Sequence, residues 1–530
     1  MSSPGDDPIR SASPDPGPGP NPGPNPGPGP SPAPAAPDPR RWWGLVVIAL
    51  AQLMVILDAT IVNIALPSAQ RDLGMSDGNR QWVITAYTLA FGGLLLLGGR
   101  VADLVGRKRT FIIGLVGFAA ASALGGAAGG SGMLFGARAL QGVFAAVLAP
   151  SALSLLTTTF ADPKERGKAF GIFGAIAGGG SAIGLLAGGL LTEYLDWRWC
   201  LYVNVPIALV ALLGAFAVLH DHRPGHTARL DVPGVLLGCG GLVALVYGFS
   251  EAQPRGWTDA LVLGLFAGAA VLLAGFVWWQ TRAPSPLLPL HVIKDRNRAG
   301  CFLTMALATI GLFALFLFLT YYLQGVLRYS PVKTGLAFLP MTAAIITGST
   351  QISARLLHHV PPRALIVPGM LLAALGMVLL TGLTADGEYA THVLPGMLLT
   401  GLGMGLTFMP VFATATSGVA PQDAGVTSAT VNTSQQVGGS IGTALLNTVA
   451  TTSTTAYVTA HLRDPAERAR ITAEGVVHGY TVAIWWAVGI MLLAGLVAGL
   501  LVTSRAPRHL VPPGEDAAAE NADARTAHGN

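Results

Sequence analysis

The chain has 530 residues, of which 11% are charged and 52% are hydrophobic, and its mean hydropathy is +0.56. Soluble domains typically contain about 25% charged residues, so this composition excludes an ordinary soluble protein and predicts an integral membrane protein. The formal net charge of +4 is small and scattered, which gives no support for nucleic-acid binding. The three cysteines share no motif spacing, so neither a disulfide framework nor a thiolate metal site is expected.

The first 39 residues hold 15 of the 37 prolines, many of them at alternate positions. Proline lacks a backbone donor and has a fixed φ, so this stretch cannot form a helix or a sheet. Glycine does not recur at every third residue, which excludes collagen, and the apolar segment of a signal peptide is missing. We expect a disordered cytoplasmic tail, with a ligand for a proline-recognising domain as the alternative.

From Trp42 onward, apolar runs recur with short interruptions, and each is near the roughly 20 residues that cross a bilayer. Fourteen spans are predicted, near 42–66, 80–98, 110–130, 133–159, 168–192, 198–219, 232–251, 258–279, 299–323, 334–355, 363–383, 391–415, 426–450 and 479–503. The expected fold class is therefore an all-α integral membrane protein. Because fourteen is even, both termini should face the same side.

The distribution of Lys and Arg predicts the orientation. With the N-terminus inside, 21 of the 31 Lys and Arg residues fall in cytoplasmic segments and 9 in outside loops. Such an excess is the positive-inside pattern. We therefore expect a multi-pass protein of the cell membrane with both termini cytoplasmic.

The spans divide naturally into two groups of six and a central pair. The predicted boundaries are a tail at 1–41, an N-terminal half at 42–219, the central pair with its flanking loops at 220–297, a C-terminal half at 298–505 and a second tail at 506–530. The longest outside loop, about 451–478, is expected to hold at most a short surface helix.

Two ionisable residues, Asp58 and Arg138, lie well inside the predicted spans. A charge in the bilayer interior is costly, so each is a candidate functional residue. From the helical rise, Asp58 lies about 13 Å from the outer end of its helix and Arg138 roughly 8 Å deep, within reach of each other. The functional interpretation is that Asp58 binds and releases a proton under the influence of Arg138. The alternatives are a fixed structural hydrogen bond for Asp58 and an Arg138 that extends to the outer interface.

The predicted loop between the second and third spans runs from Gly99 to Arg109 and contains four basic residues together with Asp103. A positive-inside cluster explains the basic residues but not Asp103, which could pair with a loop arginine or cap a neighbouring helix. Gly99 and Gly106 would allow close approach and a tight turn.

The fifth and thirteenth spans have distinctive compositions. The fifth is rich in glycines, several of them four residues apart, which favours close helix packing: Gly174, Gly178, Gly180, Gly184, Gly188 and Gly189. The thirteenth is polar, with Asn432, Gln435 and Gln436 among its residues. Such side chains must face protein or a water-filled cavity, so a cavity wall is favoured over interhelical hydrogen bonding alone.

No catalytic constellation is found in the sequence. It contains no P-loop motif, so the chain does not carry its own ATPase of that type. His220, His222 and His226 lie close together in a predicted cytoplasmic loop without a carboxylate-rich partner, which gives little support for a metal site. The chain is therefore not expected to be an enzyme or to need a cofactor.

Three motifs resemble the major facilitator superfamily, in particular its fourteen-span branch of drug:proton antiporters. They are the first-span string 57–67 (LDATIVNIALP), the loop 99–109 (GRVADLVGRKR) and the fourth-span string 138–142 (RALQG). Weaker resemblance lies at 197–206, 321–324 and 335–340. The similarity covers about residues 42–505.

The resemblance implies a fold, a mechanism and roles for particular residues. Two six-helix halves would rock about a central cavity in alternating access, exporting amphipathic organic compounds by using the proton gradient, and the protein would work as a monomer. Proton coupling is implied for Asp58 and Arg138. A cytoplasmic gate is implied for Gly99, Arg100, Asp103, Gly106, Arg107 and Lys108, and cavity lining is expected of Gln141, Asn432, Gln435 and Gln436.

The fifth-span antiporter motif departs from the family pattern, which ends Gly-Pro-x-x-Gly-Gly. Leu185 stands in the place of the proline, between Gly184 and the pair Gly188 and Gly189. Proline bends a helix by removing one hydrogen bond, so its loss weakens the inference of export from this motif. A proton-coupled uptake symporter or another non-drug transporter is the alternative function.

Overall fold

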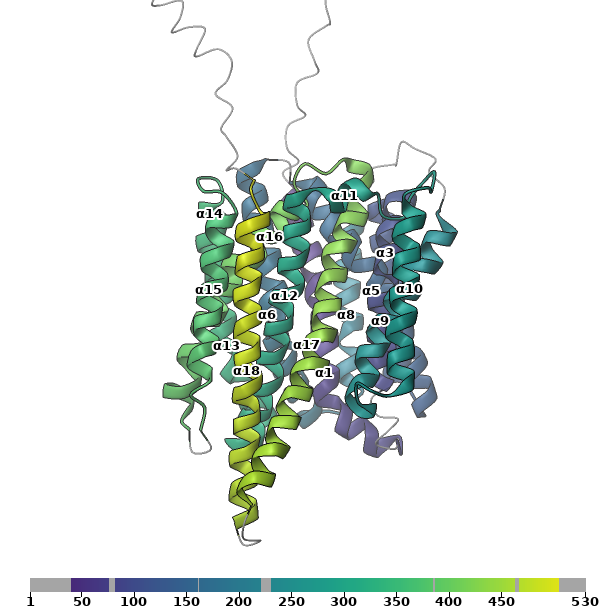
Figure 1. Ribbon diagram of the computed structural model, residues 1–530. Helices are drawn as coiled ribbons and strands as arrows, with labels where there is room; N and C mark the ends of the chain where they lie inside the picture. Colours follow the sequence, from purple (N-terminus) through teal and green to yellow (C-terminus); the bar gives the residue numbers. More distant parts are fainter. Residues whose placement is uncertain are drawn as a thin grey trace, which may run out of the picture. The chain divides into compact units, whose positions relative to one another are not determined.

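The computed structural model describes residues 40–75, 82–160, 162–220, 230–384, 387–462 and 467–504. In these residues all regular secondary structure is helical, and the long helices form a bundle along one common direction (Figure 1). The proline-rich segment and the C-terminal tail lie outside the described residues. The end of the bundle that carries the short helix α11 is called the α11 end below, and it is the upper end in Figure 1.

The helices before residue 220 correspond to the predicted N-terminal half. They are α1 (Arg41–Asp72), α3 (Trp82–Val105), α4 (Arg107–Gly126), α5 (Ser131–Thr159), α6 (Pro163–Tyr194), the short α7 (Trp199–Tyr202) and α8 (Asn204–Val218). The next two, α9 (Val232–Arg255) and α10 (Ala260–Gln280), match the predicted central pair, and α11 (Leu290–Lys294) follows.

The remaining helices correspond to the predicted C-terminal half. They are α12 (Arg296–Tyr321) with η1 (Tyr322–Val326), α13 (Pro331–Ile346) with η2 (Thr347–Ser353) and α14 (Ala354–Leu356), α15 (Arg363–Leu380), η3 (Tyr389–Val393) with α16 (Leu394–Ala415), η4 (Pro421–Asp423), α17 (Ala424–His461) and α18 (Arg468–Leu501). Here η1, η2 and η3 are π-helical and η4 is a 3₁₀ turn.

Every predicted span overlaps a helix, but the count of fourteen spans is not confirmed. Twelve helices in the described residues are long and apolar enough to cross a membrane. A thirteenth is α6, which bends by 47° between its segments Glu165–Ala177 and Ala182–Tyr194. Helix α17 is 38 residues long but is rich in Thr, Ser, Asn and Gln, so it does not meet the same test of apolarity.

Two segments predicted as loops are helical instead. Helix α3 continues to Val105 and α4 begins at Arg107, so the turn between them is the single residue Gly106, whose φ of +104° suits glycine. The predicted outside loop 451–478 is also mostly helix, since α17 extends to His461 and α18 begins at Arg468. Hydropathy ends a span where polar residues begin, yet these two helices continue because each packs against the other, and their lower ends project below the neighbouring helices in Figure 1.

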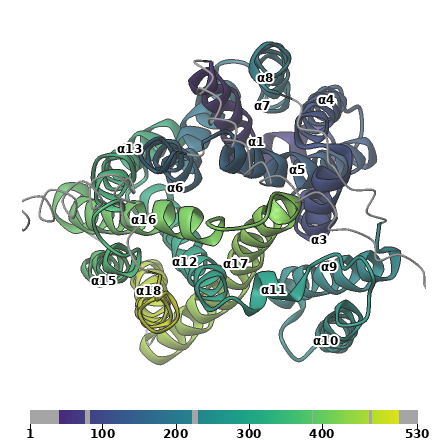
Figure 2. The ribbon, with the colours of Figure 1, turned by 90° about the horizontal axis from the view of Figure 1, so that it is seen from above.

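Contacts between α3 and α17 and between α6 and α13 join the two predicted halves. The central pair lies beside α3 and α17 in the view along the bundle (Figure 2). There the Thr85 hydroxyl of α3 lies 3.1 Å from that of Ser250 on α9, and the Trp257 indole donates to Thr448 of α17 at 2.9 Å. The pair therefore contacts helices of both predicted halves.

The outer faces of the peripheral helices expose large apolar side chains. On α8 and α10, Leu213 is 70% exposed and Val271 is 71% exposed. Contiguous apolar surface of this kind is unfavourable in water and favourable against hydrocarbon, so these faces are suited to contact lipid. The fold is that of a multi-pass membrane protein.

Candidate functional site

Asp58 of α1 and Arg138 of α5 form an ion pair inside the bundle. Arg138 Nη1 lies 2.6 Å from Asp58 Oδ2, and the two side chains are 2% and 0% exposed. Opposite charges that lose water together are far less costly than either charge alone. The two ionisable residues that the sequence placed deep in the spans are therefore direct partners.

Three further polar side chains surround Asp58. Gln141 Nε2 and Asn204 Nδ2 both donate to Asp58 Oδ1, at 3.0 and 2.8 Å. The same two amides donate to Ser122 Oγ, at 2.6 and 3.4 Å. Together with the ion pair, these bonds form a buried network that joins α1, α4, α5 and α8.

Arg138 has several partners besides Asp58. Its Nε donates to the Val83 carbonyl at 3.1 Å and its Nη1 to Gln141 Oε1 at 2.8 Å. The Tyr87 ring lies 4.4 Å from the guanidinium carbon, as in a cation–π contact. Because of these partners, Arg138 retains interactions in the protein even if Asp58 loses its negative charge.

The network depends on the spacing of two residues on α5 and on the position of the first residue of α8. Arg138 and Gln141 are three residues apart, so they project from the same face of α5. Asn204 is the first residue of α8, which places its side chain at the end of that helix, against α1 and α4. Sequence reasoning missed Asn204, Ser122 and Tyr87. A signal existed only for Asn204, a lone amide at the entry to an apolar span.

Asp103 lies near the α11 end and joins α3 to α17. Its carboxylate accepts hydrogen bonds from the backbone N–H groups of Gly425 and Val426, at 2.9 and 3.1 Å. These donors belong to the first turn of α17, where the helix dipole favours an anion. Arg107 lies 3.8 Å from the same carboxylate.

The other residues of the 99–109 motif have distinct contacts. Gly99 packs so closely on α17 that a Cβ there would meet the Gly425 carbonyl and the Ala429 side chain. Lys108 Nζ donates to the Leu219 carbonyl just beyond the end of α8, at 2.5 Å. Arg100 is buried, at 7% exposure. The motif thus connects α17, α4 and α8 at one end of the bundle.

The glycines of α6 pack against α1. A Cβ at Gly180 would meet Ile56, one at Gly184 would meet Thr60, and one at Gly188 would meet Ile61. Gly189 is also buried. The bend in α6 falls between Ala177 and Ala182, in a Gly-Gly-Gly-Ser sequence, so α6 bends without a proline at position 185.

The four expected cavity-lining residues lie on two helices, Gln141 on α5 and the other three within five positions of one another on α17. Gln141 is in the Asp58 network, and Asn432 is 4% exposed with its amide bonded to the Ser428 carbonyl of its own helix. Gln435 and Gln436 are half-buried on α17, and the Gln436 side chain lies near Gly92 of α3. Whether these side chains line a substrate cavity stays a prediction.

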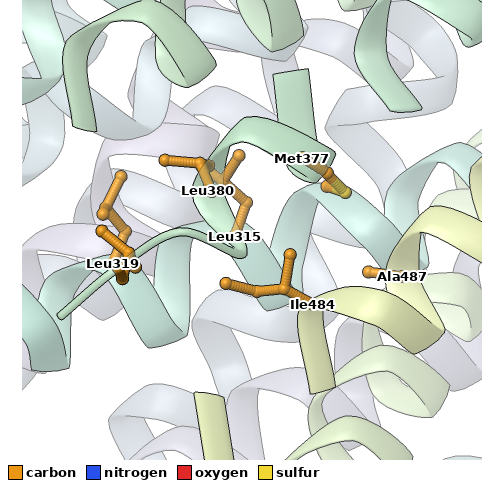
Figure 3. Close-up of a pocket in the computed structure, with 7 residues that line it drawn as sticks. Leu315, Leu319, Met377, Leu380, Ile484 and Ala487 are labelled. Atoms are coloured by element: carbon orange, nitrogen blue, oxygen red, sulfur yellow. The ribbon is translucent and has the colours of Figure 1, made fainter. Parts of the chain in front are cut away.

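Two small apolar pockets are lined by other residues. Figure 3 shows the first, where Leu315 and Leu319 of α12, Met377 and Leu380 of α15, and Ile484 and Ala487 of α18 converge. The second lies beside Arg138 and includes Val62, Leu66 and Trp197. In the part of the chain that the structure describes, no cluster of three or more His, Cys, Asp or Glu side chains could hold a metal ion.

The family model of the Major Facilitator Superfamily matches residues 48–443. The chain belongs to the major facilitator superfamily. It is therefore a multi-pass membrane transporter, as the motifs at 57–67, 99–109 and 138–142 predicted.

Among its relatives, the puromycin resistance protein pur8 of Streptomyces alboniger is 60% identical over 471 residues, covering 88% of this chain and 93% of that protein. The cephamycin export protein CmcT of Amycolatopsis lactamdurans is 40% identical, covering 76% of this chain and 84% of that protein. The crystal structure of the human organic anion transporter MFSD10 (TETRAN) has the same fold, with a TM-score of 0.60 at 14% identity, covering 87% of this chain and 100% of that one.

Proposed function

We propose that this transporter exports amphipathic organic compounds, antibiotics among them, in exchange for protons. The observation that carries the proposal is the buried pair of Asp58 and Arg138, which places one carboxylate inside an apolar bundle where its protonation changes the charge of the site. Membrane-embedded carboxylates with such partners mark ion and proton pathways.

Relatives support the substrate class. One that is 60% identical is a puromycin resistance protein and another is a cephamycin export protein. Both names concern small antibiotics, so a drug-like organic molecule is the proposed cargo of this chain. We assign no cofactor, because the proton gradient supplies the energy.

Protonation of Asp58 from the outside would remove its attraction for Arg138 and weaken the contact between α1 and α5. Arg138 would keep the Val83 carbonyl, Gln141 and the Tyr87 ring as partners. Because Arg138 keeps these partners, it can stay charged and buried while Asp58 is protonated. This property suits a site that alternates between two protonation states. Gln141, Asn432, Gln435 and Gln436 are the proposed polar contacts for substrate.

The proposed topology has fourteen spans in the plasma membrane, with the α11 end facing the cytoplasm. Helices α6 and α17 complete the set, because the two segments of α6 count as one bent span and α17, about 57 Å long, packs against α3, α12 and α18. The halves are 42–219 and 298–505, with the central pair in 220–297, and one copy of the chain suffices. Exposed Trp43 and Trp278 near the α11 end, and Trp199 near the other, fit interfacial belts.

Alternating access requires the contacts between the halves to break at one end at a time. Two such contacts lie on the proposed cytoplasmic side. Asp103 of α3 accepts hydrogen bonds from the first turn of α17, and Arg166 of α6 donates to the Thr416 hydroxyl at 3.2 Å. This position supports the proposed gating role of six residues of the 99–109 motif: Gly99, Arg100, Asp103, Gly106, Arg107 and Lys108. Opening toward the cytoplasm would have to separate both contacts.

The test is a susceptibility panel in an efflux-deficient bacterial host, including puromycin, a cephamycin and cationic dyes. We expect raised resistance to at least one compound, and lower accumulation of that compound only while a proton gradient is present. Asp58→Asn should abolish both effects. Asp259→Asn is the matched control, since Asp259 caps α10 outside the site and asparagine preserves the cap.

Unchanged efflux in Asp58→Asn would contradict the proton site. Accumulation of a compound driven by inward proton flow would instead support the alternative, a proton-coupled uptake symporter.

A further inference from the structure

The two amides that bond Asp58 differ in how completely their polar atoms are paired. Gln141 is engaged at both ends, because its Oε1 accepts from Arg138 while its Nε2 donates to Asp58 and Ser122. Asn204 is engaged at one end only. Its Nδ2 donates to Asp58 and Ser122, whereas its Oδ1 is buried and has no hydrogen-bond partner among the described residues.

An unpaired carbonyl oxygen is unusual in a residue that is 0% exposed. Buried polar atoms are nearly always satisfied, and exceptions in native structures concentrate where a group has a functional role. A carboxylate accepts hydrogen bonds only, so the present arrangement, with two amide donors on Asp58 Oδ1, suits the ionised form of Asp58.

A protonated Asp58 has the opposite requirement, because its new O–H group needs an acceptor. Of the side chains bonded to Asp58, Arg138 has only donors, and Gln141 already uses its carbonyl oxygen for Arg138. Asn204 alone among these three has a carbonyl oxygen with no hydrogen bond, and a half-turn of its amide brings Oδ1 to the position that Nδ2 now occupies.

Resting on the proposed role of Asp58 as the proton site, we propose that Asn204 turns its amide with the protonation state of Asp58. It donates to the carboxylate and accepts from the carboxylic acid. The proton comes from the outer aqueous phase and stays on Asp58 until release, and no covalent bond at Asn204 changes. Ser122, whose hydroxyl accepts from both amides, can donate its own hydrogen to the turned carbonyl oxygen.

The surroundings favour Asn204 as the group that turns. The charged or titratable neighbours of Asp58 are Arg138 from α5, Tyr87 from α3 and Cys200 from α7. Arginine remains charged throughout, the Tyr87 ring faces Arg138, and the Cys200 thiol contacts Thr192 at 3.3 Å. The Tyr87 hydroxyl is also buried without a hydrogen-bond partner, but among the described residues only Arg138, Gln141 and Asn204 have side chains hydrogen-bonded to Asp58. Asn204 is thus a positioning residue, which acts through Asp58.

The first experiment is infrared difference spectroscopy of the full-length protein in liposomes on acidification. We expect a protonated-carboxyl band that disappears in Asp58→Asn, and a simultaneous change in a side-chain amide band that disappears in Asn204→Leu. In Asn204→Leu the carboxyl band should move to higher wavenumber, because the acid loses its acceptor. An Asn204 amide band that is identical at both pH values would overturn the proposal.

The second experiment is proton-driven transport of puromycin in the same liposomes. Asn204→Leu can neither donate nor accept and should lower the rate roughly tenfold, as expected for the loss of a hydrogen bond to a charged group. Asn204→Ser keeps a hydroxyl that can do both and should retain most of the rate. Thr309→Val, which removes a buried hydroxyl bonded within α12, is the control and should match the wild type.

These outcomes separate the two proposals. If Asp58→Asn leaves transport and the carboxyl band unchanged, the proposed proton site fails and this inference fails with it. If Asp58→Asn abolishes coupling while Asn204→Leu transports normally, only the inference about Asn204 is wrong. An equal loss of puromycin binding and rate in Asn204→Leu and Asn204→Ser would indicate a packing role and would also overturn it.

Discussion

Asp103 of α3 accepts a hydrogen bond from the backbone N–H of Gly425, a residue 322 positions later in the chain and the second of α17. The contact is between a carboxylate and the positive end of a helix dipole, and it links the two predicted halves of the transporter where Gly99 and the Gly425 carbonyl are also closely packed. Its strength therefore bears on how readily the halves separate at the α11 end.

Asp103→Asn should shift the protein toward opening at this end. Removing the negative charge from a helix N-terminus costs about 0.3–2 kcal/mol, so the ratio of open to closed molecules should rise by roughly twofold to thirtyfold. Spin labels at Val105→Cys and Ser417→Cys, both on exposed positions, would report the distance across the contact. The native cysteines Cys200, Cys239 and Cys301 are buried and should remain unlabelled. An unchanged distance distribution would show that other contacts hold this end closed.

Arg138→Lys should lower proton-driven transport at least tenfold although the charge is kept. Arginine donates to Asp58, Gln141 and the Val83 carbonyl from one planar group, and a lysine ammonium cannot reproduce that geometry. The measurement is drug accumulation in cells with and without a proton gradient. Normal transport in Arg138→Lys would mean that charge alone is sufficient.

Arg138→Leu tests stability. It would leave Asp58 buried without its counter-ion, which typically costs about 3–5 kcal/mol. Thermal unfolding in detergent should show a lower Tm for Arg138→Leu than for the double variant Asp58→Asn with Arg138→Leu, because the double variant removes both charges. Equal Tm values would indicate that Asp58 takes up a proton at little cost when Arg138 is absent.

The sequence located the long helices because hydropathy reports which residues contact lipid. The same measure failed for the end of α17 and the start of α18, which are rich in threonines and charged residues yet remain helical through contacts such as Gly475 with Val458 and Gly479 with Thr454. It also placed a loop at 99–109, where the chain is helical on both sides of Gly106. Hydropathy alone does not indicate where a helix ends once its residues are polar.

The central ion pair was predictable because a charge in an apolar span is conspicuous. Ser122 was not predictable, and the lone amide of Asn204 was only a weak signal, since a single uncharged polar residue is common in membrane helices and nothing local links positions 58, 122 and 204. Only the packing of α1, α4 and α8 brings them together. Gln141 was found, but as a cavity residue rather than as a partner of Asp58.

Asp231, at the start of α9, should make stability depend on pH. Burial raises the pKa of its carboxyl, but hydrogen bonds from the Trp279 indole, the Gly234 N–H, the Gln280 amide and the Leu287 N–H together hold that pKa below its usual value. Because this pKa is lower in the folded state, the ionised carboxylate stabilises the fold at pH values above the unfolded-state pKa of about 3.9. This contribution is lost as the pH falls through the folded-state pKa.

Asp231→Ala should therefore lower Tm at neutral pH, with a cost of about 1–3 kcal/mol for the donors left unpaired. The difference in Tm between wild type and variant should narrow when unfolding is measured below about pH 4, because the Asp231 carboxylate of the wild type then becomes protonated and loses its stabilising contribution. A difference that stays constant from pH 7 to pH 3 would show that the charge of Asp231 contributes nothing.

Gly184→Val should separate α1 from α6 and impair transport. A Cβ at Gly184 would overlap the Thr60 hydroxyl and lie 3.2 Å from the Leu57 carbonyl, one residue before Asp58. Overpacking of this kind costs about 1–3 kcal/mol, and here the strain falls on the turn of α1 that holds Asp58, the proposed proton site. We expect reduced drug efflux and a lower Tm. Gly264→Val on α10 is the matched control, because nothing lies within 4 Å of a Cβ there and transport should be unaffected. Equal efflux in the two variants would mean that α1 and α6 can separate without disturbing Asp58.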